Sequence, residues 1–327
     1  MNSLQKQYLP GLDLLKFILA IMIVSGHCWL FEEFPTIQLW WGHFTSVAVP
    51  LFFSISSFFF FRKVYSVSEG VNTYPVLVHS IKRLIILFGC WYLLMIPMTY
   101  CRFYSVATLK ETIFAILLSC CFNGYWFIKA LIINTVILYF CRKTKMLVIC
   151  TIIAFGIYFY CAYNYIYHYN PILESFHPYY SFYYHTISFC IGAWLVRINE
   201  YKVSNAVLIL LWILAFILCY FQWMDPLFRI VSIFLIFPLF LKLTPKGINP
   251  LQLKEMRGMS IIFYMVQFVL IWLYDGACKF CIDTDTHLFQ ILQFSVTRFI
   301  IVLSVAVGIS LLILRNEAEY KWLRYLH

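Results

Sequence analysis

The chain has 327 residues, of which 63% are hydrophobic and only 12% are charged, and its mean hydropathy is +0.83. A soluble domain carries about half apolar and about a quarter charged residues, so this composition excludes a cytosolic enzyme, a secreted disulfide scaffold and a disordered tail. The net charge of +10 is typical of nucleic-acid-binding proteins, but the distribution of the charges along the chain excludes that class. The composition therefore predicts an integral membrane protein.

Apolar runs of about 20 residues, the length that crosses a bilayer as a helix, divide the whole chain. They predict about ten membrane-spanning helices, at residues 12–30, 43–61, 84–100, 125–141, 146–163, 181–198, 204–223, 227–243, 259–275 and 292–314. The segment 108–122 is apolar but shorter, so we expect a re-entrant or interfacial helix there. The pattern predicts an all-α polytopic bundle that forms one integral-membrane domain over residues 1–327.

The basic residues are distributed unevenly between the two sides of the membrane. Most of the 24 lysines and arginines lie in loops on the N-terminal side, whereas the opposite loops hold Arg102, Lys110, Arg229 and Lys279. Loops rich in basic residues remain in the cytoplasm, so both termini are predicted to be cytoplasmic. The first apolar run lacks a signal-peptide pattern, and we expect it to remain as a span. The positive charge thus reflects topology and predicts no nucleic-acid partner.

The first predicted span contains three ionisable residues, Asp13, Lys16 and His27. A charged side chain at the bilayer centre costs at least about 3 kcal/mol, so each of them needs a partner or a role. Asp13 and Lys16 are i, i+3 neighbours and can pair. Lys16 and His27 lie on one side of the helix, about 16 Å apart along its axis. Two interpretations remain open at this point, an ion pair with an interfacial histidine or a functional site.

The residues 12–16 (LDLLK) and the following His27 resemble the opening segment of the integral-membrane acyltransferase family 3, which has the pattern L-D-x-x-R and a histidine eleven residues after the arginine. Further resemblances follow in the family's order, at residues 50–58 (PLFFSISSF), 82–83 (KR), 125–131 (YWFIKAL), 189–192 (FCIG) and 260–264 (SIIFY). Together these segments cover most of the chain.

The chain also departs from the pattern of that family at several positions. Lys16 stands where the family usually has arginine, which keeps the charge but loses the bidentate fork. Ser57 replaces the usual glycine, and Ile86 stands where many members carry a second arginine. Gln267 stands where a histidine often follows the Tyr264 motif. The resemblance to the family survives these departures, but they weaken a residue-by-residue transfer of its mechanism.

The resemblance implies an acyltransferase that moves an acyl group, commonly acetyl, from cytoplasmic acyl-CoA to a hydroxyl of a sugar, glycolipid or surface polysaccharide. It implies acetyl-CoA as co-substrate and a glycan or glycolipid as acceptor. It also implies that the protein lies in a lipid bilayer, namely the bacterial cytoplasmic (inner) membrane. His27 is the candidate general base, because an imidazole takes and returns a proton near neutral pH. Asp13 and Lys16 are expected to hold the donor arm, and Lys82 and Arg83 to attract its phosphates.

Other polar residues within or beside the spans are candidates for binding the acceptor. Glu32 and Glu33 either orient His27, bind the acceptor or belong to a solvated loop. Trp126 is either a stacking surface for a sugar or an interfacial anchor. Ser56 is expected to be a pore-lining or packing hydroxyl rather than an acylated nucleophile, since no base can be placed beside it.

Lys129 and Arg298 are predicted to be buried charges that line a pocket or form pairs. The rival hypothesis is a transporter or flippase in which they line a substrate path together with Asp13 and Lys16. The cysteine pairs 120–121 and 278–281 lack a second ligand pair, so we expect no metal site. The sequence assigns no oligomeric state.

Overall fold

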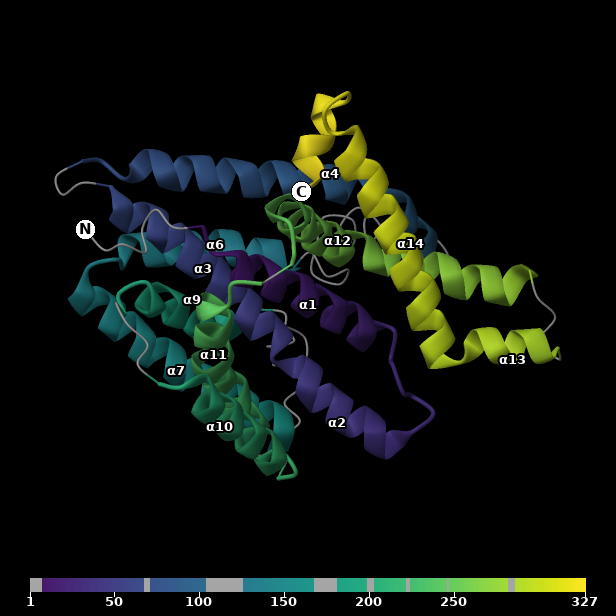
Figure 1. Ribbon diagram of the computed structural model, residues 1–327, viewed down its shortest axis with the longest axis horizontal. Helices are drawn as coiled ribbons and strands as arrows, with labels where there is room; N and C mark the ends of the chain where they lie inside the picture. The colour runs from purple at the N-terminus through teal and green to yellow at the C-terminus, as the bar shows by residue number, and fades with distance from the viewer. Residues whose placement is uncertain are drawn as a thin grey trace. The chain divides into compact units, whose positions relative to one another are not determined.

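The computed structural model describes residues 8–67, 71–103, 126–167, 181–198, 203–221, 224–245, 247–281 and 286–327. Every regular element within these residues is a helix (Figure 1), which confirms the predicted all-α class. The re-entrant or interfacial helix expected at 108–122 lies outside the described residues.

Each of the ten predicted spans coincides with a helix longer than ten residues, and two of the remaining elements are short. The helices are α1 (Pro10–His27), α2 (Pro35–Ser46), α3 (Ala48–Ser66), α4 (Tyr74–Phe103), α6 (Trp126–Phe140), α7 (Thr144–Tyr167), α9 (Phe182–Leu195), α10 (Asn205–Leu218), α11 (Asp225–Lys242), α12 (Pro250–Cys281), α13 (His287–Gln293), α14 (Ser295–Asn316) and the 3-10 helix η5 (Lys321–Leu326).

Among the described residues, six helical stretches are long and apolar enough to cross a membrane. They are Pro10–His27, Pro35–Ser66, Tyr74–Leu94, Thr144–Asn164, Pro250–Lys279 and Ser295–Asn316, and two shorter helices, α6 and α10, are also apolar. The protein is therefore helical with several candidate membrane spans, while the number ten and the cytoplasmic termini stay predictions.

The exposed surface of α10 is itself apolar. Among its residues only Leu208 is buried, whereas Leu210, Leu211 and Leu214 are exposed. Monomeric soluble proteins rarely expose a contiguous apolar surface of this kind, but lipid tails are as apolar as leucine. The surface of this helix therefore suits a bilayer and not water.

The second predicted span, 43–61, lies within the candidate span Pro35–Ser66 but crosses the boundary between two helices. The apolar window 43–61 begins inside α2, but the structure ends α2 at Ser46 and starts α3 at Ala48. Val47 separates the two helices while keeping right-handed helical backbone angles. A hydropathy window cannot detect such a break, because both flanking segments are apolar.

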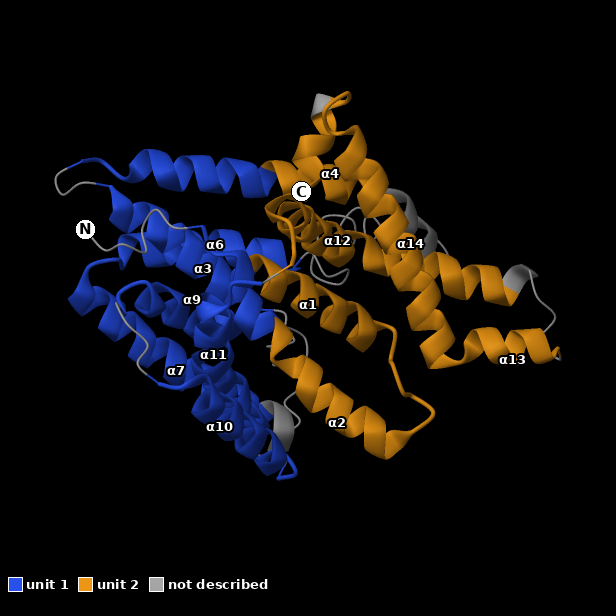
Figure 2. Cartoon of the chain, in the orientation of Figure 1, with its two compact units in different colours: residues 1–12, 49–85, 126–246 blue, residues 13–48, 86–125, 247–327 orange. Residues whose placement is uncertain are grey.

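The described chain forms two compact units, coloured separately in Figure 2. Unit 1 comprises residues 1–12, 49–85 and 126–246, and unit 2 comprises residues 13–48, 86–125 and 247–327. The unit boundaries fall inside α1 and α4, so continuous helices contribute to both units. We describe each unit by itself.

In unit 1, α3 packs closely on α9 through small polar side chains. The Ser54 hydroxyl donates to the carbonyl of Ser188 (2.7 Å), and the Ser57 hydroxyl donates to the carbonyl of Phe189 (2.5 Å). A Cβ on Gly192 would lie 2.2 Å from the Ser54 carbonyl oxygen, so only glycine permits this approach. Small residues and interhelical hydrogen bonds are the usual means of packing helices in lipid.

In unit 2, α12 and α14 lie side by side and run in opposite directions (Figure 1). Asp275, near the C-terminal end of α12, lies 3.8 Å from Arg298 in the first turns of α14. At the other end, a Cβ on Gly258 would meet the Leu314 side chain at 2.7 Å. The two helices therefore form a close antiparallel pair.

The close approach at Gly192 leads to a stability prediction. Gly192→Ala places a methyl group against the α3 backbone, and overpacking of this kind lowers the free energy of unfolding by about 1–3 kcal/mol. We expect a lower thermal midpoint for this variant in detergent. The matched control is Gly156→Ala on α7, where a Cβ would meet nothing within 4 Å; an unchanged midpoint for Gly192→Ala would contradict the observed α3–α9 packing.

Candidate functional site

The candidate catalytic residues of the first span lie on α1 within unit 2. Asp13 is buried, Lys16 is half-buried, and His27 is exposed at the last position of the helix. The helix starts at Pro10, whose fixed φ suits the first helical position, and it carries Asp13 in its first turn, where a negative charge is favourable. Because Lys16 and His27 belong to one continuous helix, their predicted separation of about 16 Å holds.

Three contacts show that α12 follows α1 in the same direction. The Arg257 guanidinium lies 3.9 Å from the Asp13 carboxylate. The ring of Phe263 lies 5.6 Å from that of Phe17, and the ring of Phe268 lies 4.5 Å from that of His27. The contacts occur in the same order along both helices, so α12 runs parallel to α1 from the Asp13 end to the His27 end.

Arg257 was not among the candidate residues, since the sequence places it in a loop rich in basic residues. The structure brings it to a buried carboxylate on α1. A buried carboxylate requires a cation nearby. This requirement was the only indication in the sequence that a basic residue from another helix pairs with Asp13. It could not distinguish Arg257 from the other basic residues of the same loop.

His27 is exposed at the residue level, and its ring has one aromatic neighbour. Its ring is tilted 55° against Phe268, and neither of its nitrogens forms a hydrogen bond within the part of the chain that the structure describes. An imidazole with uncommitted nitrogens can accept a proton from a hydroxyl that approaches it. The role of His27 as a general base stays a prediction.

The turn that follows His27 is bound to the start of α14. The Glu33 carboxylate accepts hydrogen bonds from the backbone N–H (2.6 Å) and the hydroxyl (2.5 Å) of Ser295. The Phe31 N–H donates in turn to the Ser295 hydroxyl (3.0 Å). Desolvation acts to raise the pKa of the Glu33 carboxyl, but the hydrogen bonds from Ser295 and the charge of Arg298 outweigh it and lower the pKa. Glu33 therefore serves as the cap of α14.

This turn contains two residues in the left-handed backbone region, Trp29 (φ 53°) and Phe31 (φ 71°). Bulky side chains rarely adopt this conformation, and it persists only where surrounding contacts impose it. Here the hydrogen bonds of Phe31 and Glu33 to Ser295 supply such contacts.

Arg298 is largely buried, with 14% of its side chain exposed, and it pairs with two carboxylates. Its guanidinium donates to Glu32 at 3.0 Å and lies 3.8 Å from Asp275. The sequence led us to expect that Arg298 lines a pocket or forms an ion pair, and the structure shows the ion pair. Glu32 and Glu33 are both exposed at the residue level, yet each binds α14 rather than forming part of an unattached loop.

In unit 1, Trp126 belongs to a buried aromatic stack. The His185 ring stacks on Phe53 at 4.7 Å and on Trp126 at 5.0 Å, and the Phe53 and Trp126 rings lie 6.3 Å apart, so the three rings form one cluster. Trp126 and His185 are buried, so Trp126 does not present an exposed face for a sugar, while its role as an interfacial anchor stays a prediction. His185 lies on α9, whereas its two ring partners lie on α3 and α6, so the sequence could not show that these rings meet.

The expectation that Lys129 is a buried charge is wrong. Its side chain is exposed, whereas the neighbouring Ile128 and Ala130 are buried. The periodicity of α6 turns this position outward, which the sequence could not show because both faces of the helix are apolar. Ser56 is half-buried, while Ser54 and Ser57 hold the α3–α9 contact.

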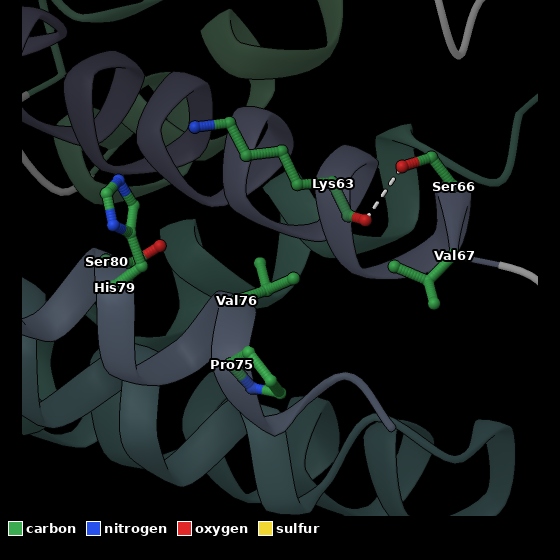
Figure 3. Close-up of a pocket in the computed structure, with 7 residues that line it drawn as sticks. All are labelled: Lys63, Ser66, Val67, Pro75, Val76, His79 and Ser80. Atoms are coloured by element: carbon green, nitrogen blue, oxygen red, sulfur yellow. Dashed lines mark hydrogen bonds between the residues drawn. The ribbon is translucent and has the colours of Figure 1, made fainter. Parts of the chain in front are cut away.

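A cavity of about 430 Å³ lies between the end of α3 and the start of α4 (Figure 3). Its lining residues are Lys63, Ser66, Val67, Pro75, Val76, His79 and Ser80. Lys82 and Arg83 are exposed on the next turn of α4, and Arg83 follows His79 by four residues, so it continues the lining face of the helix. Lys63 and His79 in the lining, with Arg83 one helical turn beyond it, favour an anionic ligand.

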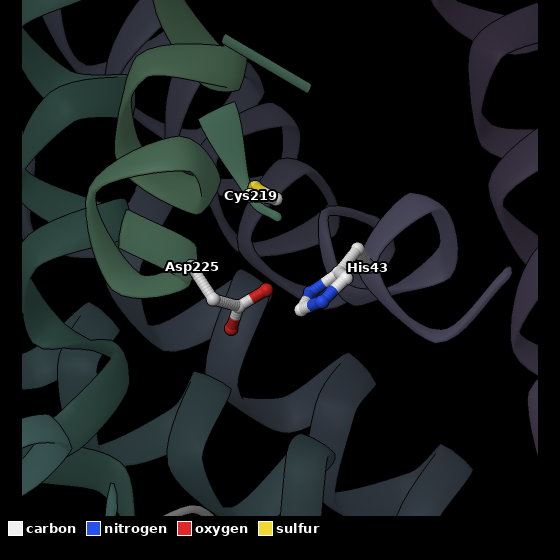
Figure 4. Close-up of side chains that lie close together, drawn as sticks. All are labelled: His43, Cys219 and Asp225. Carbon is white, nitrogen blue, oxygen red and sulfur yellow. The ribbon is translucent and has the colours of Figure 1, made fainter. Parts of the chain in front are cut away.

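Asp225 and Cys219, both of unit 1, are drawn in Figure 4. The Asp225 carboxylate accepts hydrogen bonds from Arg229 at 2.7 Å and forms an ion pair with it at 2.6 Å. The charge of this carboxylate is thus neutralised within its own helix, and the carboxylate needs no metal ion for that purpose.

A family model for an acyltransferase domain, that of the acyltransferase 3 family, matches residues 9–323. This range includes nearly all of both units and every candidate residue named above. No curated protein and no solved structure shows a significant match to the chain.

The lowered pKa of Glu33 predicts a pH-dependent stability. The ionised carboxylate is stabilising above the ordinary glutamate pKa, and this contribution is lost as the pH falls through the lowered pKa of the folded state. Glu33→Gln should therefore lower the thermal midpoint at pH 7, and the difference from the wild type should shrink below about pH 4. Glu319→Gln, at an exposed glutamate, is the control; a deficit for Glu33→Gln that is the same at every pH would refute the capping role.

Proposed function

Since the chain belongs to the acyltransferase 3 family and is an acyltransferase, we propose that it transfers an acyl group, in particular acetyl, from cytoplasmic acyl-CoA to a hydroxyl of a sugar, glycolipid or surface polysaccharide. We place this activity in the cytoplasmic membrane of a bacterium. The single observation that supports it is the helix α1, which carries a cation at one end and an exposed, uncommitted imidazole at the other.

The proposed reaction is a direct transfer without an acyl-enzyme. His27 takes the proton of the acceptor hydroxyl while the hydroxyl oxygen attacks the thioester carbonyl. The new C–O bond forms, the C–S bond breaks, and the CoA thiolate leaves with the proton that the imidazolium returns. Lys16 holds the donor arm, and Asp13, paired with Arg257, supports this end of the helix.

The donor also carries phosphates, which need cations outside the apolar interior. We assign them to Lys63 and His79, which line the cavity between α3 and α4, and to the adjacent Lys82 and Arg83. This assignment follows from charge complementarity. In the predicted orientation this end of α3 and α4 faces the cytoplasm, where acyl-CoA is found.

The alternative hypothesis is that the protein is not an enzyme but a transporter or flippase. In that hypothesis Asp13, Lys16, Lys129 and Arg298 line a path for a sugar-linked or anionic substrate. The structure supports it less, because Asp13 and Arg298 have carboxylate or guanidinium partners within unit 2 and Lys129 is exposed.

Removal of the proposed base gives the most direct test. His27→Ala should reduce acyl transfer from labelled acetyl-CoA by about 10²–10⁴-fold, the usual contribution of general-base catalysis. His287→Ala, an exposed histidine at the start of α13, should retain full activity. Transfer measured in membranes that is undiminished by His27→Ala would remove this residue from the mechanism.

The cavity between α3 and α4 predicts a donor-specific defect. The double variant Lys63→Ala, Arg83→Ala should raise the KM for acetyl-CoA by roughly tenfold or more, since hydrogen bonds to charged groups are lost. The KM for S-acetylpantetheine, which lacks the nucleotide and its phosphates, should not change. Lys145→Ala, an exposed lysine near the start of α7, is the control; equal losses with both donors would show that the cavity does not bind the phosphates.

A further inference from the structure

Gln267, in the middle of α12, has a buried amide oxygen without a hydrogen-bond partner. The residue is fully buried, with 0% of its surface exposed. Its amide nitrogen donates to the carbonyl of Tyr264 at 3.1 Å, but its Oε1 atom has no partner in the described part of the chain. Buried polar atoms are almost always paired, and an unpaired acceptor in an apolar interior is destabilising.

The helical position of Gln267 directs its side chain toward α1. With about 100° per residue, Gln267 lies about 40° around α12 from Phe263, and Phe268 lies about 140° from Phe263 in the same sense. Phe263 and Phe268 both contact α1, at Phe17 and His27. Gln267 therefore faces α1 between these two contacts.

Gln267 also lies on the Lys16 side of His27. Because α12 runs parallel to α1, a residue that precedes Phe268 lies toward the Lys16 end of α1. The offset from the His27 contact is small, since one residue advances a helix by about 1.5 Å. In the predicted orientation this is the side from which a cytoplasmic donor enters.

We propose that the Oε1 atom of Gln267 accepts a hydrogen bond from the amide N–H of the acyl donor that lies two methylene groups from the thioester sulfur. The inference rests on the proposed function and names the residue that recognises the donor arm. Every acyl-CoA carries this N–H, and inside an apolar bundle it requires an acceptor. When the thioester lies at His27, the N–H lies a short distance back along the arm, at the level of Gln267.

The chemistry of the side chain matches this ligand. A neutral amide oxygen suits a neutral amide N–H, because a carboxylate at this buried position would carry the desolvation cost of a charge. The Gln267 amide nitrogen is already bound to Tyr264, which fixes the orientation of the oxygen. The site is thus organised before the donor arrives, and binding gains the hydrogen bond without the cost of ordering the side chain.

The experiment compares two small thioester donors with wild-type protein and Gln267→Leu in the full chain. One donor is S-acetyl-N-acetylcysteamine, which retains the amide N–H, and the other is its isostere with CH₂ in place of that N–H. The wild type should prefer the amide donor by roughly tenfold in kcat/KM, and Gln267→Leu should lose this preference. Its thermal midpoint should be unchanged or raised, because the unpaired oxygen is removed.

The same substitution at an exposed position of the same helix gives the control. Gln252 is exposed and accepts the N–H of Asn249 at the start of α12, so Gln252→Leu should keep the preference for the amide donor. The proposal would be overturned if Gln267→Leu still preferred the amide donor. It would also be overturned if kcat/KM fell equally with both donors and the thermal midpoint of the variant were lower. A higher KM for the acceptor alone would assign the hydrogen bond to the acceptor instead.

These outcomes also separate the inference from the function on which it depends. If the wild type transfers acetyl from no thioester, the acyltransferase proposal fails as a whole. If transfer proceeds and the two donors react equally well in the wild type, only the role of Gln267 fails.

Discussion

The arrangement of unit 2 depends on one constraint, that polar groups on an apolar helix need partners from within the protein. α1 carries Asp13, Lys16 and His27 among mostly apolar residues, and α12 supplies Arg257 at one end and Phe268 at the other. A carboxylate without such a partner would be costly in lipid. The parallel course of α12 along α1 thus follows from electrostatics as well as from aromatic packing.

The same constraint explains the turn after His27. Its backbone is strained at Trp29 and Phe31, and Glu33 and Phe31 hold it against Ser295 at the start of α14. The unsatisfied N–H groups of a helix start favour a carboxylate, so the capping of α14 and the fixation of this turn are one interaction. Because the turn is continuous with α1, the position of His27 is linked to α14, which is far away in sequence.

The sequence could predict what is periodic or continuous and could not predict which helices meet. The all-α class and the approximate positions of the spans follow from apolar runs, and the relation between Lys16 and His27 follows from helical spacing. The partners Arg257 and Ser295 depend on tertiary packing, on which hydropathy has no bearing. Lys129 shows the same limit, since α6 is apolar on all sides and its pattern does not indicate which face is exposed.

The two units differ in what their buried polar groups do. In unit 1 the Thr186 hydroxyl donates to the Asn134 amide oxygen, and the Asn134 amide nitrogen donates to the Phe182 carbonyl, so this network is satisfied and holds helices together. In unit 2 the His27 ring and the Gln267 oxygen are uncommitted on the α1–α12 contact. Stability alone favours satisfied groups, which is why the proposed acyl transfer and donor recognition are placed at His27 and Gln267 on α1 and α12.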